Sequence, residues 1–254
     1  MTEKEKLIAL YAQNSKHSNY QILSDRLSSI INAEDINVRT RYEKERLCFI
    51  LKNVSVKGKS IVDIGGNSGY FSFELIEAGA KKAIYYEGNK VHADFVKLAS
   101  KVLEVEEKIE IHNRYFTFTS ELNDNKADII LLLNVLHHIG DDYGNSTLSM
   151  QKAKEEILKQ LNSLCKKTDM LIFQLGFNWK GNSNTCLFEH GTKTELIDFI
   201  TKGIQPFWDI QCIGIAEKNH SIIEYKLLSE ENSQRQDSLG EFLNRPLFIL
   251  KSKK

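Results

Sequence analysis

The residues best suited to chemistry form one short loop, Asp63-Ile-Gly65-Gly66-Asn67-Ser68-Gly69. An apolar run leads into the aspartate, and a pattern typical of a helix follows the last glycine. Glycines suit a loop whose backbone must approach a ligand, because they lack a Cβ and tolerate positive φ. The loop therefore predicts a ligand site where a strand ends and a helix begins.

The glycine spacing separates this loop from two better-known phosphate-binding loops. A dinucleotide fingerprint counted from Gly65 would need further glycines at Asn67 and Tyr70. A P-loop would need Gly-Lys followed by Ser or Thr, and the loop contains no such triplet. The remaining pattern is Asp-x-Gly-x-Asn-x-Gly, in which asparagine is tolerable because it visits the left-handed region readily. An ordinary glycine turn is the structural alternative.

A second acid has the spacing of a ribose ligand. Residues 82–86 predict a strand, and Glu87 follows it, 18 residues after Gly69. In nucleoside-binding α/β folds, an acid about 20 residues beyond the glycine loop accepts hydrogen bonds from the ribose hydroxyls. An acid after a strand is often a helix cap, but the distance from the loop favours the ribose role.

A third pattern follows an apolar strand. Residues 129–133 are all apolar, as in a central parallel strand, and Asn134-Val-Leu-His137-His138 comes next. Histidine is a natural general base near neutral pH, so His137 or His138 could deprotonate an acceptor alcohol. An anionic acceptor would need no base, and the pair would then hydrogen-bond the anion. A structural role for one histidine is the alternative.

Together these patterns, over residues 61–140, resemble the motifs of class I S-adenosylmethionine (SAM) methyltransferases. The first motif of that family is Asp/Glu-x-Gly-x-Gly-x-Gly, with Asn67 here at the middle glycine, and the Leu-His-His segment resembles its fourth motif in small-molecule and ubiquinone-type enzymes. The resemblance implies SAM as cofactor and S-adenosylhomocysteine as product. It assigns cofactor contacts to Asp63, Gly65, Gly66, Asn67, Ser68, Gly69, Phe71, Glu87, Leu133 and Asn134.

One family feature is missing. The acid that usually follows the third strand and contacts adenine is replaced by Asn113-Arg114-Tyr115. We expect these three residues to recognise the base instead, with Asn113 at its edge and Tyr115, or the following Phe116, on its face.

Acceptor contacts are expected from loops at the same sheet edge and from the N-terminal segment. Aromatic side chains would wall the acceptor, and a cation would meet a phosphate. The candidates are Tyr20, Arg41, Tyr143, Trp179, Lys180 and His190. Each of these residues alone is more typical of a surface or packing position than of a ligand contact. The pair Asp141-Asp142 lacks the additional oxygens that a hard cation requires, so no metal site is expected.

The elements around these motifs predict a mixed α/β fold. Strands at 60–64, 82–86, 108–112, 128–133 and 169–175 alternate with helices, which argues for a parallel sheet. Further strands are expected at 207–215, 221–228 and 247–250. The family resemblance implies a seven-stranded, mostly parallel Rossmann-like sheet with helices on both faces. Residues 217–245 then form an insertion before the last strand. Three short helices in residues 1–52 would form a lid on the methyltransferase domain, residues 53–254.

Composition excludes several classes of protein. The 254 residues carry a formal net charge of +0, which argues against a nucleic-acid partner. The four cysteines form no Cys-x-x-Cys pair and fit neither a zinc site nor a disulfide framework. The N-terminus lacks the apolar core of a signal peptide, and no apolar run approaches the about 18 residues of a membrane span. We expect a cytoplasmic protein; its oligomeric state is not readable.

We therefore predict a SAM-dependent methyltransferase that acts on an oxygen of a small polar acceptor. A general similarity to methyltransferases of bacterial surface-polysaccharide gene sets suggests a sugar, or a phosphorylated or nucleotide-linked precursor of capsule modification, as acceptor. Two alternatives remain. One is a tRNA-modifying methyltransferase of the same fold, because some wobble-uridine enzymes share a similar fourth motif. The other is a SAM-binding module without chemistry.

Overall fold

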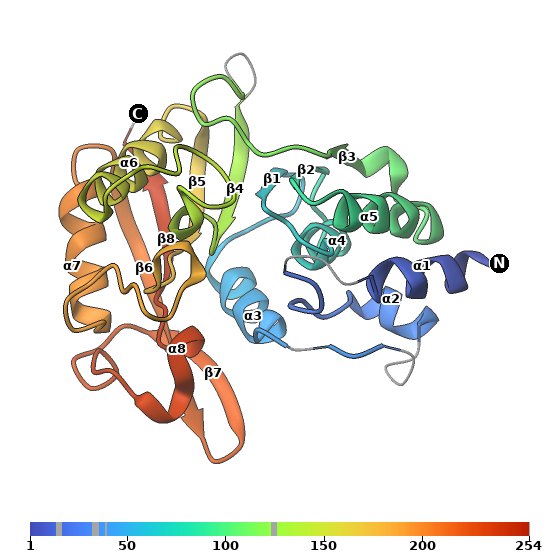
Figure 1. Ribbon diagram of the computed structural model, residues 1–254. Helices are drawn as coiled ribbons and strands as arrows, with labels where there is room; N and C mark the ends of the chain where they lie inside the picture. Colours follow the sequence, from blue (N-terminus) through green and yellow to red (C-terminus); the bar gives the residue numbers. More distant parts are fainter. Residues whose placement is uncertain (14–16, 32–35, 39, 123–125, 254) are drawn as a thin grey trace. The chain divides into compact units, whose positions relative to one another are not determined.

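The computed structural model describes residues 1–13, 17–31, 36–38, 40–122 and 126–253 (Figure 1). The chain forms two compact units. Unit 1 comprises Met1–Leu47 and Leu51–Phe116, and unit 2 comprises Cys48–Ile50 and Thr117–Lys254. Among the described residues, no helix has the length and apolar character needed to cross a membrane.

Unit 1 contains three parallel strands in the order β3-β2-β1: β1 (Ser60–Ile64), β2 (Lys82–Tyr86) and β3 (Ile109–His112). Their register pairs Ile64 with Tyr86 and Tyr86 with His112, so the three carboxyl ends meet at one edge. The predicted strands are confirmed to within one residue. The segments that follow β1, β2 and β3 therefore start side by side.

Five helices accompany these strands: α1 (Glu3–Tyr11), α2 (Asp25–Ile30), α3 (Glu43–Asn53), α4 (Tyr70–Glu77) and α5 (Lys90–Val102), with a 3₁₀ turn at Glu106–Lys108. A capping box of Thr2 and Glu5 starts α1, and the Asn89 side chain caps α5. Helix α1 packs against α5, with the Tyr11 and Phe95 rings 5.7 Å apart. The three N-terminal helices are confirmed, and their role as a lid stays a prediction.

Unit 2 contains five strands in the order β4-β5-β8-β6-β7: β4 (Ala127–Leu133), β5 (Thr168–Gln174), β6 (Trp208–Asn219), β7 (Ile222–Leu227) and β8 (Leu247–Ser252). Strands β4 and β5 are parallel, and the other three pairings are antiparallel. Strand β8 lies between β5 and β6, which suits its fully buried residues 247–250. The last strand along the chain is therefore an interior strand.

The helices of unit 2 are α6 (Met150–Ser163), α7 (Lys193–Ile204) and the short α8 (Gly240–Leu243), with 3₁₀ turns at Leu136–His138, Trp179–Gly181 and Asp237–Leu239. Thr192 caps α7 in a capping box with Glu195. Helices α6 and α7 approach closely, since a Cβ on Gly203 would lie 2.3 Å from a Leu158 methyl carbon.

The mixed α/β class is confirmed, but the predicted count of seven strands is one short. The eighth strand is β7, which matches the strand predicted at 221–228 but lies inside the stretch 217–245 that was interpreted as an insertion. A two-residue turn at His220 and Ser221 folds β7 back on β6, which therefore continues past its predicted end at residue 215. The antiparallel closing pair expected of the sheet is formed by β6 and β8.

Candidate functional site

The glycine loop joins β1 to α4 at the carboxyl edge of the unit 1 strands. Gly65, Asn67 and Gly69 have φ of 72°, 51° and 80°, all in the left-handed region. Asn67 therefore has the left-handed conformation, which asparagine adopts more readily than most residues, so it can stand where the family motif has glycine. Its side-chain oxygen also accepts a hydrogen bond of 2.8 Å from the Ser68 N–H, which orders the turn.

Gly66 is required by close packing rather than by its φ. A Cβ at this position would lie 2.5 Å from the Tyr85 ring and 2.9 Å from Asp63 Oδ2. The Tyr85 hydroxyl donates a hydrogen bond to the Asn67 carbonyl, so the loop lies directly on this ring. Sequence reasoning missed Tyr85, because a buried aromatic residue in a strand has no pattern that separates this role from packing.

Glu87 links the end of β2 to the loop after β1. Its Oε2 accepts a 2.9 Å hydrogen bond from the Asn67 N–H, and its Oε1 accepts a 2.8 Å bond from the Asn89 N–H. These two bonds fix the position of the carboxylate at the end of β2. The structure therefore brings the predicted ribose acid into direct contact with the predicted cofactor loop.

Asp63 is a buried carboxylate, only 4% exposed, whose Oδ2 accepts a 2.8 Å hydrogen bond from the Ser72 hydroxyl. Burial raises the pKa of Asp63 from 3.8 to about 6; the Ser72 bond opposes this rise, and the charge of Glu87 adds to it. A cation beside Asp63 would offset the cost of burying its charge. That chemistry suits the amino group in the methionine portion of SAM, the cofactor for which the family resemblance predicts a contact with Asp63.

Gln21 caps the first turn of α4. Gly69 has no side chain for this role, and the Gln21 Oε1 instead accepts hydrogen bonds from the Tyr70 N–H, at 2.9 Å, and the Ser68 hydroxyl, at 3.0 Å. The Tyr11 hydroxyl in turn donates to the Gln21 carbonyl at 2.7 Å. The N-terminal segment is thereby tied to the loop by a residue that carries no local signal in the sequence.

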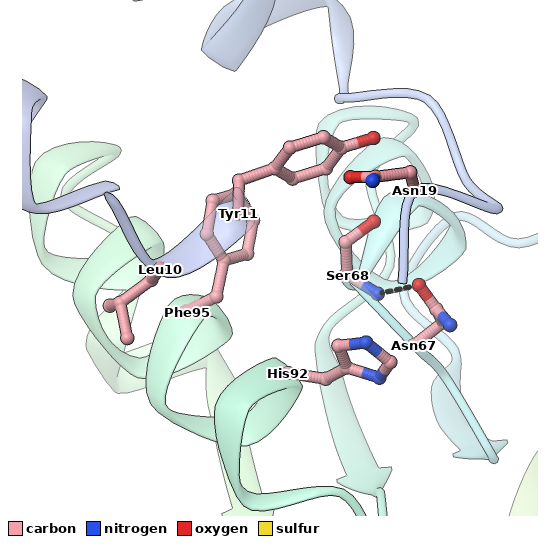
Figure 2. Close-up of a pocket in the computed structure, with 7 residues that line it drawn as sticks. All are labelled: Leu10, Tyr11, Asn19, Asn67, Ser68, His92 and Phe95. Atoms are coloured by element: carbon pink, nitrogen blue, oxygen red, sulfur yellow. Dashed lines mark hydrogen bonds between the residues drawn. The ribbon is translucent and has the colours of Figure 1, made fainter. Parts of the chain in front are cut away.

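A small pocket of about 10 Å³ lies beside the loop, lined by Leu10, Tyr11, Asn19, Asn67, Ser68, His92 and Phe95 (Figure 2). This is room for about one water molecule, so the pocket is too small for a nucleoside. The His92 ring points toward Asn67 and Ser68, and within the described part of the chain its Nδ1 has no hydrogen-bond partner. Burial lowers the pKa of His92 to about 4, helped by His17, so the ring is neutral at pH 7.

The residues after β3 pack against the backbone of Glu87 and Gly88. The Asn113 side chain donates a 3.0 Å hydrogen bond to the Glu87 carbonyl. Tyr115 lies against Gly88, where a Cβ would come within 2.5 Å of the ring, and is 53% exposed. Arg114 lies over Tyr86, 5.2 Å from the ring centroid. The predicted base-recognition residues are thus gathered beside Glu87.

Phe71 is positioned differently from the other predicted cofactor residues. It is 3% exposed within α4, and the Arg46 guanidinium lies 5.0 Å from its ring centroid. Its observed contacts are those of a core residue.

In unit 2 the end of β4 is held by a polar network. Asn134 has a φ of 63°; its Nδ2 donates to Gln174 Oε1 at 2.9 Å, and its Oδ1 accepts from Arg245 Nη1 at 2.8 Å. Gln174 Nε2 donates to the Arg245 carbonyl at 3.0 Å. Glu241 accepts from Arg245 Nε at 3.0 Å and from the Phe177 N–H at 3.0 Å. Both oxygen and nitrogen of the Asn134 amide are thereby oriented, next to Leu133 at the strand end.

Sequence reasoning missed Glu241 and Arg245. They stand four residues apart, a spacing typical of a helical ion pair, and this was the available signal. Nothing local connected the pair to Asn134, which lies 111 residues away from Arg245.

The two histidines after β4 have different surroundings. His137 is 3% exposed, its Nδ1 accepts a 3.2 Å hydrogen bond from the Gly176 N–H, and a Cβ on Gly176 would clash with its ring. His138 is 15% exposed, with its Nδ1 3.3 Å from Asp142 Oδ2 and 4.0 Å from Asp141 Oδ2. A carboxylate beside Nδ1 orients an imidazole and stabilises its cation, so His138 has the better environment for a base.

Three predicted acceptor residues surround this 3₁₀ turn. Trp179 Nε1 donates to the Ile139 carbonyl at 2.8 Å, and the Tyr143 hydroxyl donates to the Leu136 carbonyl at 3.4 Å. Lys180 Nζ lies 4.6 Å from the Trp179 ring centroid. Burial and the charge of Asp142 raise the pKa of Tyr143, so its hydroxyl remains protonated. Trp179 is 9% exposed and mainly stabilises the turn.

The other acceptor candidates lie elsewhere. His190 is exposed and donates through its backbone N–H to Glu195, at the start of α7. Tyr20 and Arg41 belong to unit 1, where the guanidinium lies 4.7 Å from the tyrosine ring centroid. The structure thus pairs these two residues with each other.

Comparison with known proteins places the fold. A scan against protein-family models finds no match. The chain is similar to WbdD, a bifunctional kinase-methyltransferase, with a TM-score of 0.60 and 14% identity over 96% of the chain and 47% of that protein. It is also similar to magnesium protoporphyrin IX methyltransferase from Synechocystis PCC 6803 with bound S-adenosylhomocysteine, with a TM-score of 0.50 and 16% identity over 82% of the chain and 80% of that enzyme. The chain has the class I methyltransferase fold.

Two curated relatives match part of this methyltransferase-fold chain. Both are tRNA U34 carboxymethyltransferases, one from Helicobacter acinonychis (strain Sheeba), 28% identical over 90 residues, and one from Helicobacter pylori (strain Shi470), 27% identical over 120 residues. The matches cover 35% and 47% of the chain, and 34% and 44% of those enzymes. The chain therefore matches less than half the length of either relative.

Proposed function

We propose that the protein is a SAM-dependent methyltransferase that transfers the methyl group to an oxygen of a small polar acceptor. The hydrogen bond between the Asn67 N–H and Glu87 Oε2 carries the proposal. It joins the glycine loop to the acid after the neighbouring strand, which is the arrangement that binds a ribose beside a glycine loop in nucleoside-binding folds. The buried carboxylate of Asp63 supports it, since that group gains from a cationic ligand.

Within this proposal each unit has a separate task. In unit 1, Glu87 accepts hydrogen bonds from the ribose hydroxyls, the loop backbone contacts the methionine portion, and Asp63 holds its amino group. SAM, when bound, supplies an electrophilic methyl group on a sulfonium. The link that Tyr11 and Gln21 form to the loop supports a lid role for the N-terminal helices. Such a lid would exclude water from the reaction.

In unit 2, His138 is the proposed general base. Asp142 Oδ2 lies 3.3 Å from Nδ1, so Nε2 is the nitrogen that takes the proton of the acceptor hydroxyl as its oxygen attacks the methyl group. His137 supports the turn through its bond from Gly176. A sugar hydroxyl of a surface-polysaccharide precursor is the proposed acceptor class, because such an alcohol needs a base.

Transfer of radiolabelled methyl from SAM to nucleotide-linked sugars tests the proposal. His138→Ala should lower turnover by about a hundredfold or more, the usual contribution of a general base, and leave binding of S-adenosylhomocysteine unchanged. Asp142→Asn should lower it less. His220→Asn, in the β6–β7 turn, is the matched control and should have no effect. If His138→Ala keeps full turnover, His138 is not the general base.

The two curated relatives favour a second candidate, modification of a tRNA nucleoside. A formal net charge of +0 argues against it, because affinity for nucleic acid comes largely from cationic contacts to phosphates. If the protein methylates tRNA, and its tRNA binding weakens steeply as salt is added, then tRNA is the acceptor and the small polar acceptor is wrong. Tight cofactor binding with no transfer to either acceptor class would indicate a binding module.

A further inference from the structure

His92, on α5, is a buried residue with an unused hydrogen-bonding nitrogen. It is 7% exposed, and among the residues that the structure describes no group forms a hydrogen bond with its Nδ1. The ring points toward Asn67 and Ser68 of the glycine loop and lines the small pocket beside that loop (Figure 2). Leaving a buried polar atom unpaired lowers the stability of a folded chain. Packing alone would therefore favour an apolar side chain at this position.

A charged acceptor lies close to this nitrogen. The His92 Nδ1 is 4.0 Å from Glu87 Oε2, which is about 1 Å beyond the length of a hydrogen bond. The same Oε2 accepts the 2.9 Å bond from the Asn67 N–H that joins Glu87 to the glycine loop. A carboxylate oxygen can accept more than one hydrogen bond. A short movement of either side chain would therefore add Nδ1 to the donors that hold this carboxylate.

The imidazole has the protonation state that such a bond needs. Burial lowers the pKa of His92 to about 4, and the charge of His17 adds to this effect. At pH 7 the ring is therefore neutral and carries one N–H, on either nitrogen. A carboxylate beside Nδ1 favours the tautomer with the proton on Nδ1. His92 is thus a neutral donor beside the carboxylate of Glu87.

We propose that His92 is a positioning residue for Glu87: in the cofactor complex its Nδ1–H donates to Oε2 and holds the carboxylate in place for the ribose hydroxyls. This inference rests on the proposed function, which assigns the ribose to Glu87. The Glu87 side chain is 13% exposed, and a bound ribose would cover what remains. Hydrogen bonds to an ionised group strengthen as water is excluded, because the effective dielectric constant falls. The bond is therefore favoured most when the cofactor is bound.

Three substitutions separate positioning from packing. His92→Leu removes the unpaired nitrogen, so the ligand-free protein should be at least as stable in urea unfolding as the wild type. Calorimetry with S-adenosylhomocysteine should nevertheless show binding that is weaker by about tenfold or more, because a bond to a charged group is lost. His92→Asn places an amide nitrogen where Nδ1 lies and should bind within about threefold of the wild type. His92→Gln places it near Nε2 instead and should bind as weakly as His92→Leu. A histidine with only a structural role would lose stability and affinity together.

Combined substitutions test the link to Glu87. In a Glu87→Ala background, His92→Leu should weaken binding no further, because His92 acts through that carboxylate. Lys97→Ala, at an exposed position of the same helix, is the control and should bind as the wild type does.

The outcomes distinguish this inference from the proposed function. If the wild type binds S-adenosylhomocysteine and His92→Leu binds it equally well, the positioning role is wrong while the cofactor site stands. The positioning role is also wrong if His92→Leu weakens binding as much in Glu87→Ala as in the wild type. If the wild type does not bind, the proposed function fails and this inference fails with it.

Discussion

Replacing Asp63 with asparagine removes a buried negative charge while nearly preserving the shape of the side chain. The carboxylate is buried beside Ser72, and burial raises its pKa from 3.8 to about 6. A raised carboxyl pKa means that the folded chain holds this proton more tightly than the unfolded chain does. Burying the ionised form therefore costs stability, and the neutral asparagine avoids that cost.

The size of the effect follows from the pKa difference. One unit corresponds to about 1.4 kcal/mol, so a rise from 3.8 to about 6 corresponds to about 3 kcal/mol. Below pH 3.8 the carboxyl is protonated in both states and costs nothing. Between pH 3.8 and about 6 unfolding releases a proton, so stability falls as pH rises; above this range the full cost remains. Asp63→Asn should gain about 3 kcal/mol at pH 7.5 and about half of that at pH 5.

Urea unfolding of the wild type and the variant at several pH values measures this difference. Calorimetry with S-adenosylhomocysteine should show that the stabilised variant has lost affinity, because an amide cannot balance a ligand ammonium. Ser72→Ala is the informative companion: it removes the bond that favours ionised Asp63, so it should destabilise more at pH 7.5 than at pH 5. Equal stability of Asp63→Asn and wild type across the range would refute a costly buried charge.

Three further substitutions test the supports of the site. Gly66→Ala should push the loop off the Tyr85 ring, costing about 1–3 kcal/mol in urea unfolding and weakening cofactor binding in calorimetry. Gln21→Ala should remove the cap of α4 and lower the unfolding free energy by about 1 kcal/mol, whereas Gln21→Glu should retain most of it. Arg245→Lys should lose the planar guanidinium that donates to Asn134, so turnover should fall by about tenfold while circular dichroism is unchanged. Unchanged turnover would show that Arg245 contributes only to packing.

The strands that lead into the site were predictable, because each combines a short apolar run with a polar residue at its carboxyl end. Strands β1 and β2 match their expected bounds, and Asp63 and Glu87 mark where they end. Strand β7 matches the strand predicted at 221–228, but the family template of seven strands placed it inside an insertion, so the predicted count was one short. Its alternation of apolar and charged residues, Ile223 to Leu227, already indicated a strand.

The supports of the site were less predictable. The glycine loop and Glu87 are local patterns with known spacing. Gln21 reaches α4 from 49 residues upstream, and Arg245 reaches Asn134 from 111 residues downstream. Such contacts depend on how the chain folds back, and a single sequence carries no spacing rule for them. The same limit hid the contact of His137 with Gly176, 39 residues downstream, whereas Asp142 is a near neighbour of His138 in the sequence.

Titration calorimetry with S-adenosylhomocysteine tests the central claim, a nucleoside site formed by the glycine loop and Glu87. The wild type should bind, and Glu87→Ala should bind at least about tenfold more weakly, since each lost hydrogen bond to a charged group is worth about 1.5–3 kcal/mol. Glu107→Ala, an exposed acid of the same unit, should bind as the wild type does. Absence of binding by the wild type, or equal affinity in Glu87→Ala, would contradict the account.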